Sequence, residues 1–174
     1  LHALTMRRVA AEAAVSAPAL YRHFASKEAL VWLVVGEGYG HLMHYLGRAL
    51  AKPTPVERFV ESGRGYLDFA RDKPGYYTLV FGSTMRDLGH EHIPETTRVR
   101  GAAALQMLVD RVRECIDTGA FVADDARSVA LFVWSEVHGL ASLRLGGRLA
   151  ELDDAAYASE SERCLERIVR ALRR

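Results

Sequence analysis

The chain has 174 residues, 49% of them hydrophobic and 26% charged, which is the balance of a globular protein with one or two domains. Its 23 Lys and Arg residues nearly offset 22 Asp and Glu residues, which excludes a uniformly basic nucleic-acid binder and an acidic disordered tail. Two cysteines, Cys115 and Cys164, argue against a secreted fold built on disulfides. No apolar run approaches the roughly 18 residues that span a bilayer, and no secretory signal opens the chain. We therefore expect a cytoplasmic protein without membrane contact.

Apolar residues recur at three- and four-residue spacing almost throughout, and strict alternation over a strand length is scarce. This periodicity predicts an all-α fold. We expect a linker at residues 52–55 and an irregular segment at 82–93. The expected helices lie near residues 5–13, 16–24, 26–50, 55–71, 76–81, 94–118, 125–145 and 154–173.

The first two expected helices are short and are joined by a tight break at Ala14-Val15, which makes them a helix-turn-helix candidate. Small residues lead the second helix, as entry into the major groove requires, and hydroxyl, imidazole and guanidinium groups that can reach phosphates follow. Lys27 lies at the next helix start, where backbone N–H groups also attract phosphate. Leu20 and Phe24 point inward, and the outward positions are Ala17, Pro18, Ala19, Tyr21, Arg22 and His23.

The segments 4–10, 15–16, 20–24 and 26–30 together resemble the signature of the tetracycline-repressor (TetR) family of bacterial transcriptional regulators. The resemblance implies a homodimer that binds near-palindromic, double-stranded operator DNA. By the same resemblance, backbone phosphates are bound by Thr5, Tyr21, His23 and Lys27, and base edges are faced by Arg7, Ala17, Pro18, Ala19 and Arg22.

The chain departs from the family pattern in two places. Ala14 occupies the turn position that usually holds glycine, where a left-handed backbone costs alanine about 1–2 kcal/mol. The family's first helix would lie upstream of Leu1, so we expect the natural protein to begin earlier by about one helix. We accordingly assign residues 1–45 to an N-terminally truncated DNA-binding domain and residues 46–174 to a helical effector-binding and dimerisation domain.

The expected helix at 125–145 is apolar almost all round, so it must be covered on every side. One face can meet the core of its own domain and the other a partner subunit. The last helix carries an apolar stripe, and TetR-like proteins dimerise through two such terminal helices. The predicted interface residues are Val133, Val137, Leu140, Leu165, Ile168 and Leu172.

The segments 134–139, with its Trp…His-Gly pattern, and 76–81 resemble a C-terminal subgroup of TetR-like regulators. An aromatic pocket of this kind suits a small, largely apolar or aromatic ligand with one or two polar groups. The alternative is that the same residues are ordinary core. The candidate ligand-binding residues are Tyr66, Phe69, Tyr77, Phe81, Met85, Met107, Leu108, Trp134 and His138.

These features predict a transcriptional repressor that a small molecule releases from its operator. The alternatives are a TetR-like regulator controlled without a small ligand, through protein contact or as an activator, and a helical enzyme or scaffold with a chance motif. We expect no catalysis, no cofactor and no metal site. His41 and His44 have helical spacing but no third metal ligand nearby, and the polar cluster of His90, Glu91 and His92 is expected in a loop. Cys115 and Cys164 are expected to be buried as small hydrophobes.

Overall fold

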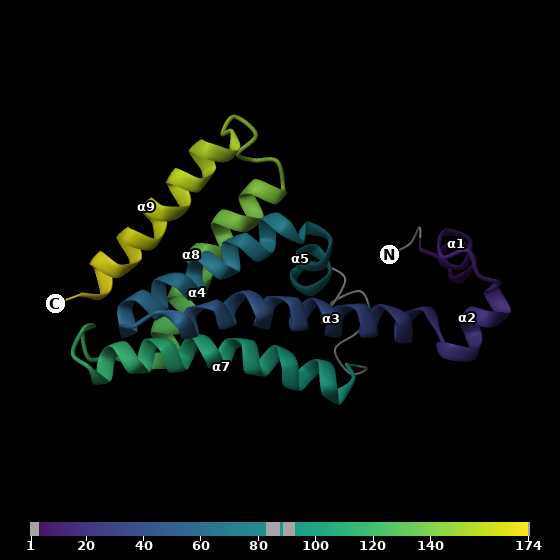
Figure 1. Ribbon diagram of the computed structural model, residues 1–174, viewed down its shortest axis with the longest axis horizontal. Coiled ribbons are helices and arrows are strands. Elements are labelled where there is room, and N and C mark those ends of the chain that lie inside the picture. Colours follow the sequence, from purple (N-terminus) through teal and green to yellow (C-terminus); the bar gives the residue numbers. More distant parts are fainter. Residues whose placement is uncertain (1–3, 83–87, 89–92, 174) are drawn as a thin grey trace.

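The computed structural model describes residues 4–82, 88 and 93–173, and the regular elements in these ranges are helices, so the predicted all-α fold is confirmed there (Figure 1). The third expected helix, near residues 26–50, ends as an α-helix at Gly47, and a short 3₁₀ helix follows it. The elements are α1 (Met6–Glu12), α2 (Ala17–His23), α3 (Lys27–Gly47), the 3₁₀ helix η1 (Arg48–Ala51), α4 (Pro55–Asp72), α5 (Pro74–Phe81), α7 (Glu95–Asp117), α8 (Ala126–Leu145) and α9 (Asp154–Leu172).

Side-chain caps determine where the first three helices begin. Thr5 Oγ1 accepts the Arg8 N–H at 3.2 Å, Ser16 Oγ accepts the Ala19 N–H at 3.2 Å, and Ser26 Oγ accepts the Ala29 N–H at 3.1 Å. Each hydroxyl satisfies a backbone donor that the first helical turn would otherwise leave without a partner. The three capping hydroxyls thus mark the first residues of α1, α2 and α3.

The N-terminal head consists of α1, α2 and the start of α3, and lies at one end of the molecule (Figure 1). Its small core contains the buried side chains of Met6, Ala10 and Leu20. Ala14, in the turn between α1 and α2, has a φ of +53°, as the family's glycine position requires. The turn is closed by the Val15 N–H, which donates to the Ala10 carbonyl at 2.9 Å. The alanine therefore adopts the left-handed conformation at the cost expected from its sequence position.

The body contains the rest of α3 together with η1, α4, α5, α7, α8 and α9 (Figure 1). Helix α3 packs against α4, α5 and α7, α8 packs against α4 and α7, and α9 packs against α4 and α8. Helix α3 crosses the predicted domain boundary between residues 45 and 46 without a break and thus belongs to both parts of the molecule.

The backbones of α3 and α4 approach closely at Gly65. A Cβ atom at this position would lie 2.5 Å from the Tyr45 carbonyl oxygen and 2.9 Å from its carbonyl carbon. Both atoms are backbone, so no side-chain rotation can relieve such a contact. Glycine at position 65 therefore sets the spacing between the two helices on which the body is built.

None of the described helices is sufficiently long and apolar to span a membrane.

We predict that Gly65→Ala destabilises the protein by about 1–3 kcal/mol, because the added methyl must push α3 and α4 apart. Urea unfolding followed by far-ultraviolet circular dichroism measures the change.

Gly40→Ala is the matched control within α3. Gly40 is exposed, and no atom lies within 4 Å of a Cβ built there. Higher helix propensity should therefore stabilise this variant by up to about 1 kcal/mol. Equal free energies of unfolding for the two variants would show that the contact at Gly65 does not constrain the fold.

Candidate functional site: a basic head and an apolar cavity

The outer face of α2 is accessible along its length. Tyr21 has 54% of its surface exposed, and Pro18, Arg22 and His23 are exposed as well, whereas Leu20 faces the head core. Thr5 and Arg7 are exposed at the start of α1, and Ala17, Ala19 and Lys27 are partly exposed. The structure therefore brings all nine residues proposed for DNA contact to the surface of the head.

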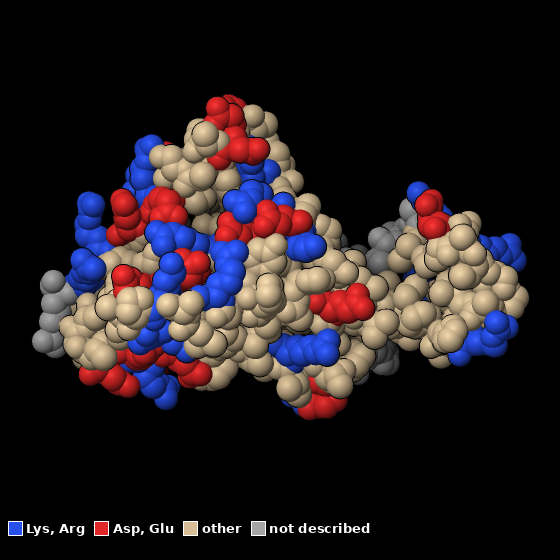
Figure 2. All heavy atoms as spheres, in the orientation of Figure 1, with Lys and Arg blue, Asp and Glu red and all other residues tan. Residues whose placement is uncertain are grey.

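Positive charge predominates on this head (Figure 2). Arg7, Arg8 and Arg22 are exposed, and the Lys27 amino group lies 3.9 Å from the Glu28 carboxylate, too far for a tight ion pair. The Thr5 oxygen accepts a bond from the backbone, which leaves its hydroxyl proton free to donate outward. Lys27 is the first residue of the 21-residue helix α3, whose N-terminal dipole adds attraction for an anion.

A cavity of about 90 Å³ lies within the body. Its described lining contains no Asp, Glu, Lys, Arg or His, so it is an uncharged, mainly apolar space. The walls come from α3, α4, α5, α7, α8 and α9, with Tyr39, Leu42, Leu46, Phe59, Ser62, Gly63, Tyr66, Phe81, Gly101, Ala104, Leu105, Met107, Leu108, Val133, Trp134, Val137 and Leu165 as lining residues.

A hydrogen-bonded aromatic network supports one wall of the cavity. The Trp134 Nε1–H donates to the Tyr66 hydroxyl oxygen at 3.3 Å, and that hydroxyl lies 2.8 Å from His138 Nδ1. The Tyr77 hydroxyl lies 3.0 Å from the same nitrogen and 2.9 Å from Ser142 Oγ. Burial lowers the pKa of His138, which favours the neutral imidazole, whose Nδ1 can accept a hydrogen bond from a tyrosine hydroxyl.

Five of the predicted ligand-binding residues line the cavity, namely Tyr66, Phe81, Met107, Leu108 and Trp134. Phe69, Tyr77 and His138 do not line it. Phe69 is fully buried against Tyr45 and Tyr77, and the polar groups of Tyr77 and His138 are bonded within the network behind Tyr66. Met85 lies outside the described residues.

Sequence reasoning missed the contribution of α3 to the cavity, including Tyr39, Leu42 and Leu46. It also missed Phe59 and the glycines Gly63 and Gly101, which leave room for neighbouring side chains. Helical periodicity could have grouped Tyr39, Leu42 and Leu46 on one face, because their spacing of three and four residues matches the helical repeat. It could not have shown that this face meets a cavity.

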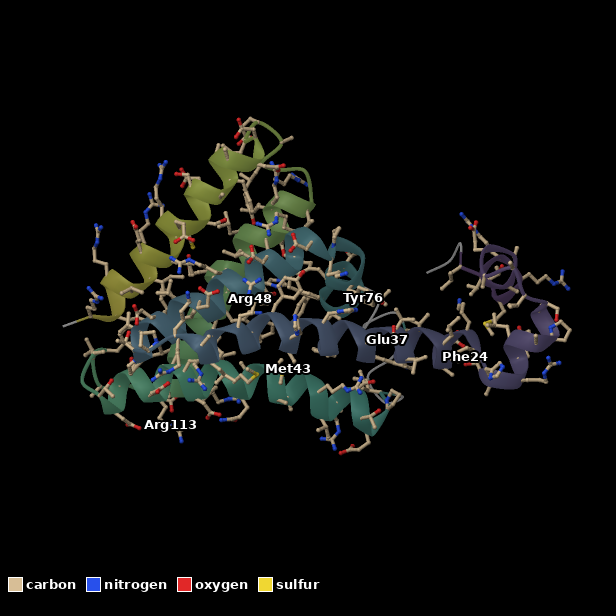
Figure 3. All side chains as sticks on the ribbon, viewed as in Figure 1. Phe24, Glu37, Met43, Arg48, Tyr76 and Arg113 are labelled. Carbon is tan, nitrogen blue, oxygen red and sulfur yellow. The ribbon has the colours of Figure 1, made fainter. Side chains whose placement is uncertain are left out.

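Contacts on two sides join the cavity region to the part of α3 nearest the head. On one side, α5 meets α3 where the Tyr76 hydroxyl donates to Glu37 Oε2 at 3.4 Å (Figure 3). On the same side, a Cβ at Gly38 would lie 2.7 Å from Val80 Cγ2. On the other side, α7 meets α3 where Arg100 Nη1 donates to the Gly36 carbonyl at 2.8 Å. Helix α3 is thus held between α5 and α7 just before it enters the head.

The predicted dimer-interface residues fall into two groups. Val133, Val137, Leu165 and Ile168 are buried within the single subunit and so offer little surface to a partner, although Ile168 also lines the groove between α8 and α9. Leu140 and Leu172 are half-exposed. The sequence of a helix that is apolar all round does not reveal which side meets its own core.

The outward face of α8 and α9 carries exposed apolar side chains, and Glu136, Glu160 and Arg167 lie among them. Phe132 and Leu143 are 42% and 47% exposed, and no atom lies within 4 Å of a Cβ built at Gly139. A shallow groove runs along this face between the two helices, and its lining includes Leu140, Leu152, Cys164 and Ala171.

No group of three or more metal-ligating side chains occurs within the residues that the structure describes. Cys115 is fully buried, and burial raises the pKa of its thiol to about 11, so the protonated thiol packs as a small hydrophobe. Cys164 is half-buried on α9, with its pKa also raised by burial.

Two family models match the chain. Residues 1–32 match the model described as bacterial regulatory proteins of the tetR family, and residues 59–172 match that of the tetracyclin repressor-like C-terminal domain. The second match alone covers more than half of the chain. None of the curated proteins matches it in sequence.

Solved structures share the same fold. A protein of unknown function from Rhodococcus sp. RHA1 is 26% identical, with a TM-score of 0.78, over 98% of this chain and 86% of that one. The TetR-family transcriptional regulator PfmR from Thermus thermophilus is 20% identical, with a TM-score of 0.77, over 99% and 91% of the two chains. The ketosteroid transcriptional regulator KstR2 of Mycobacterium tuberculosis is 20% identical, with a TM-score of 0.75, over 99% and 86%.

The helix-turn-helix head lies within the residues matched by the first family model, and most of the helical body lies within those matched by the second. This protein belongs to the TetR family of bacterial transcriptional regulators.

Proposed function

We propose that the protein is a homodimeric repressor that leaves its operator when a small, largely apolar or aromatic molecule enters the cavity. The observation that carries this proposal is that one helix serves both sites. Helix α3 begins at Lys27 in the basic head, and its residues Tyr39, Leu42 and Leu46 line the cavity. A displacement of its cavity end would therefore be transmitted to the head through a continuous hydrogen-bonded helix.

In this proposal, α2 enters the major groove of operator DNA. Ala17, Pro18 and Ala19 form its slim leading end, and Arg22 follows on the exposed face. Phosphates on either side of the groove would be bound by Thr5, Tyr21, His23 and Lys27, which flank this face. Arg7 supplies the guanidinium that reads a base edge, because arginine can bond guanine through two parallel hydrogen bonds.

The small size of the cavity favours a mechanical response to the ligand. An apolar cavity of roughly 150 Å³ is needed to hold benzene, so the 90 Å³ found here leaves little room for a drug-sized molecule. Protein interiors are close-packed, and a ligand that exceeds the space must move the helices that surround it. Helices α5 and α7 contact α3 at Glu37, Gly38 and Gly36. A movement of α5 or α7 would therefore displace α3, the helix that connects the body to the head.

The outward face of α8 and α9 is the surface we propose for dimerisation. Its exposed Phe132 and Leu143 would be covered by the same helices of a second copy, and Gly139 would allow close approach. Two heads spaced by such an interface could read two half-sites about one DNA turn apart.

Lys27→Ala should weaken binding by about the same factor on every DNA sequence and lower the salt slope of log K by about one unit, because it removes one phosphate contact. Fluorescence anisotropy at several salt concentrations, with DNA from the region upstream of the protein's own gene, gives both quantities. Lys52→Ala is the control, since Lys52 lies in the body beside Glu61 at 3.6 Å. A salt slope that Lys27→Ala leaves unchanged would remove Lys27 from the interface.

Arg7→Ala should relax base preference at a single operator position, where the wild-type protein discriminates by about 1–3 kcal/mol. The measurement is a competition series in which each base pair of the operator is replaced in turn. Arg8→Ala, at an equally exposed neighbouring residue, serves as the comparison. If Arg7→Ala lowered affinity equally for all operator variants, the base-reading role of Arg7 would be wrong.

Leu143→Glu should convert the dimer to monomers, because it replaces an exposed apolar side chain of the proposed interface by a charge that dimerisation would have to desolvate. Sedimentation velocity reports the mass of both species. Leu50→Glu changes a leucine that is 66% exposed on η1, away from this face, and should remain dimeric. A Leu143→Glu protein that is still dimeric would place the interface elsewhere.

A further inference from the structure

Most polar groups around the cavity already have partners. Ser62 Oγ donates to the Arg58 carbonyl at 3.0 Å, and the Trp134 Nε1–H donates to Tyr66. The Tyr66 hydroxyl can donate a hydrogen bond to His138 Nδ1 at 2.8 Å. Among the described residues, none accepts a hydrogen bond from the Tyr39 hydroxyl. Tyr39 therefore contributes the available polar group of the cavity wall.

The backbone of α7 leaves space for the Tyr39 ring. A Cβ atom at Gly101 would lie 3.0 Å from Tyr39 Cζ and 3.1 Å from its hydroxyl oxygen, so the missing side chain of Gly101 accommodates the end of the phenol. The ring also packs edge to face with Phe81, with ring centres 6.5 Å apart. Contacts on α5 and α7 thus hold the Tyr39 ring, with its hydroxyl beside Gly101, which is another residue of the cavity lining.

The surroundings favour a neutral hydrogen-bonding partner. Burial raises the pKa of Tyr39, so the phenol keeps its proton and remains a donor. No charged side chain occurs in the described cavity lining. A ligand carboxylate or ammonium group would lose its hydration there without gaining a counter-charge, which is a large cost.

We propose that the effector is an uncharged, mainly apolar molecule with one hydrogen-bond acceptor, such as a carbonyl oxygen, and that the Tyr39 hydroxyl donates a hydrogen bond to this acceptor. This inference rests on the ligand-responsive function proposed above. Tyr39 is then the residue that distinguishes such a molecule from a plain hydrocarbon of the same shape. Because Tyr39 is part of α3, the polar end of the effector makes its bond to the same helix that begins in the head.

Three probes of similar ring size test this proposal on the whole chain. Cyclohexanone carries the acceptor, methylenecyclohexane replaces its oxygen by a CH₂ group of nearly the same shape, and cyclohexanecarboxylate carries a charge. Dissociation constants are measured by calorimetry for the wild type, Tyr39→Phe and Tyr45→Phe. Tyr45→Phe is the matched control on α3, because its hydroxyl bonds to Asp72 at 3.1 Å on the exposed surface and does not line the cavity.

Tyr39→Phe should weaken cyclohexanone binding roughly 3- to 10-fold, the usual range for one neutral hydrogen bond, and should not weaken methylenecyclohexane binding. Tyr45→Phe should leave both constants unchanged, and cyclohexanecarboxylate should bind none of the three proteins. An equal effect of Tyr39→Phe on both neutral probes would overturn the role of Tyr39. Preferential binding of the carboxylate, or no binding of either neutral probe, would overturn the assignment of an uncharged ligand.

The affinity of the same samples for DNA, measured without any probe, keeps this result separate from the proposed function. Tyr45→Phe, whose changed hydroxyl lies outside the cavity, should bind the operator region as the wild type does. If the wild type did not bind that DNA, the repressor proposal would fail whatever the probes showed. If DNA binding were intact and only the Tyr39 dependence were missing, the repressor proposal would stand and the inference about the effector would fall.

Discussion

The continuity of α3 is the constraint on which the rest of the structure depends. A 21-residue helix spans about 30 Å, long enough to reach from the head to the middle of the body without an intervening joint. Its backbone is held against α4 by the absence of a side chain at Gly65, and its middle is held between α5 and α7. The head has only a small core of its own, so its orientation relative to the body is set mainly by this helix.

The cavity and the junction are parts of one packing arrangement. Tyr39 and Phe81 contact both the large core of the body and the small cluster formed by Val31, Trp32, Val35 and Val80. A side chain shared between two clusters cannot move in one without disturbing the other, because both are close-packed. Occupancy of the cavity and the position of the head-proximal half of α3 are therefore expected to be coupled through direct contacts.

The sequence predicted the local features well, because local chemistry determines them. Thr5, Ser16 and Ser26 are recognisable caps, and the inward positions of α2 follow from helical periodicity. It is harder to predict which apolar side chains pack in the subunit's own core and which meet a partner subunit. Val133 and Val137 are predicted to meet a partner subunit but are buried in the core of their own subunit. The identity of an apolar side chain does not show whether its own domain or a partner will cover it. Tyr39 was missed for a related reason, because a cavity forms only where several helices distant in sequence converge.

The positions of the two tryptophans give the molecule two optical reporters. Trp32 is 3% exposed at the junction of the head and the body, where its indole N–H has no hydrogen-bond partner in the described structure. Trp134 lies on the cavity wall and donates to Tyr66. Indole emission depends on local polarity and hydrogen bonding, so an occupied cavity and a displaced head would each perturb a different fluorophore. One variant that keeps only Trp32 and another that keeps only Trp134 would show, without any added label, whether the cavity fills before the head moves.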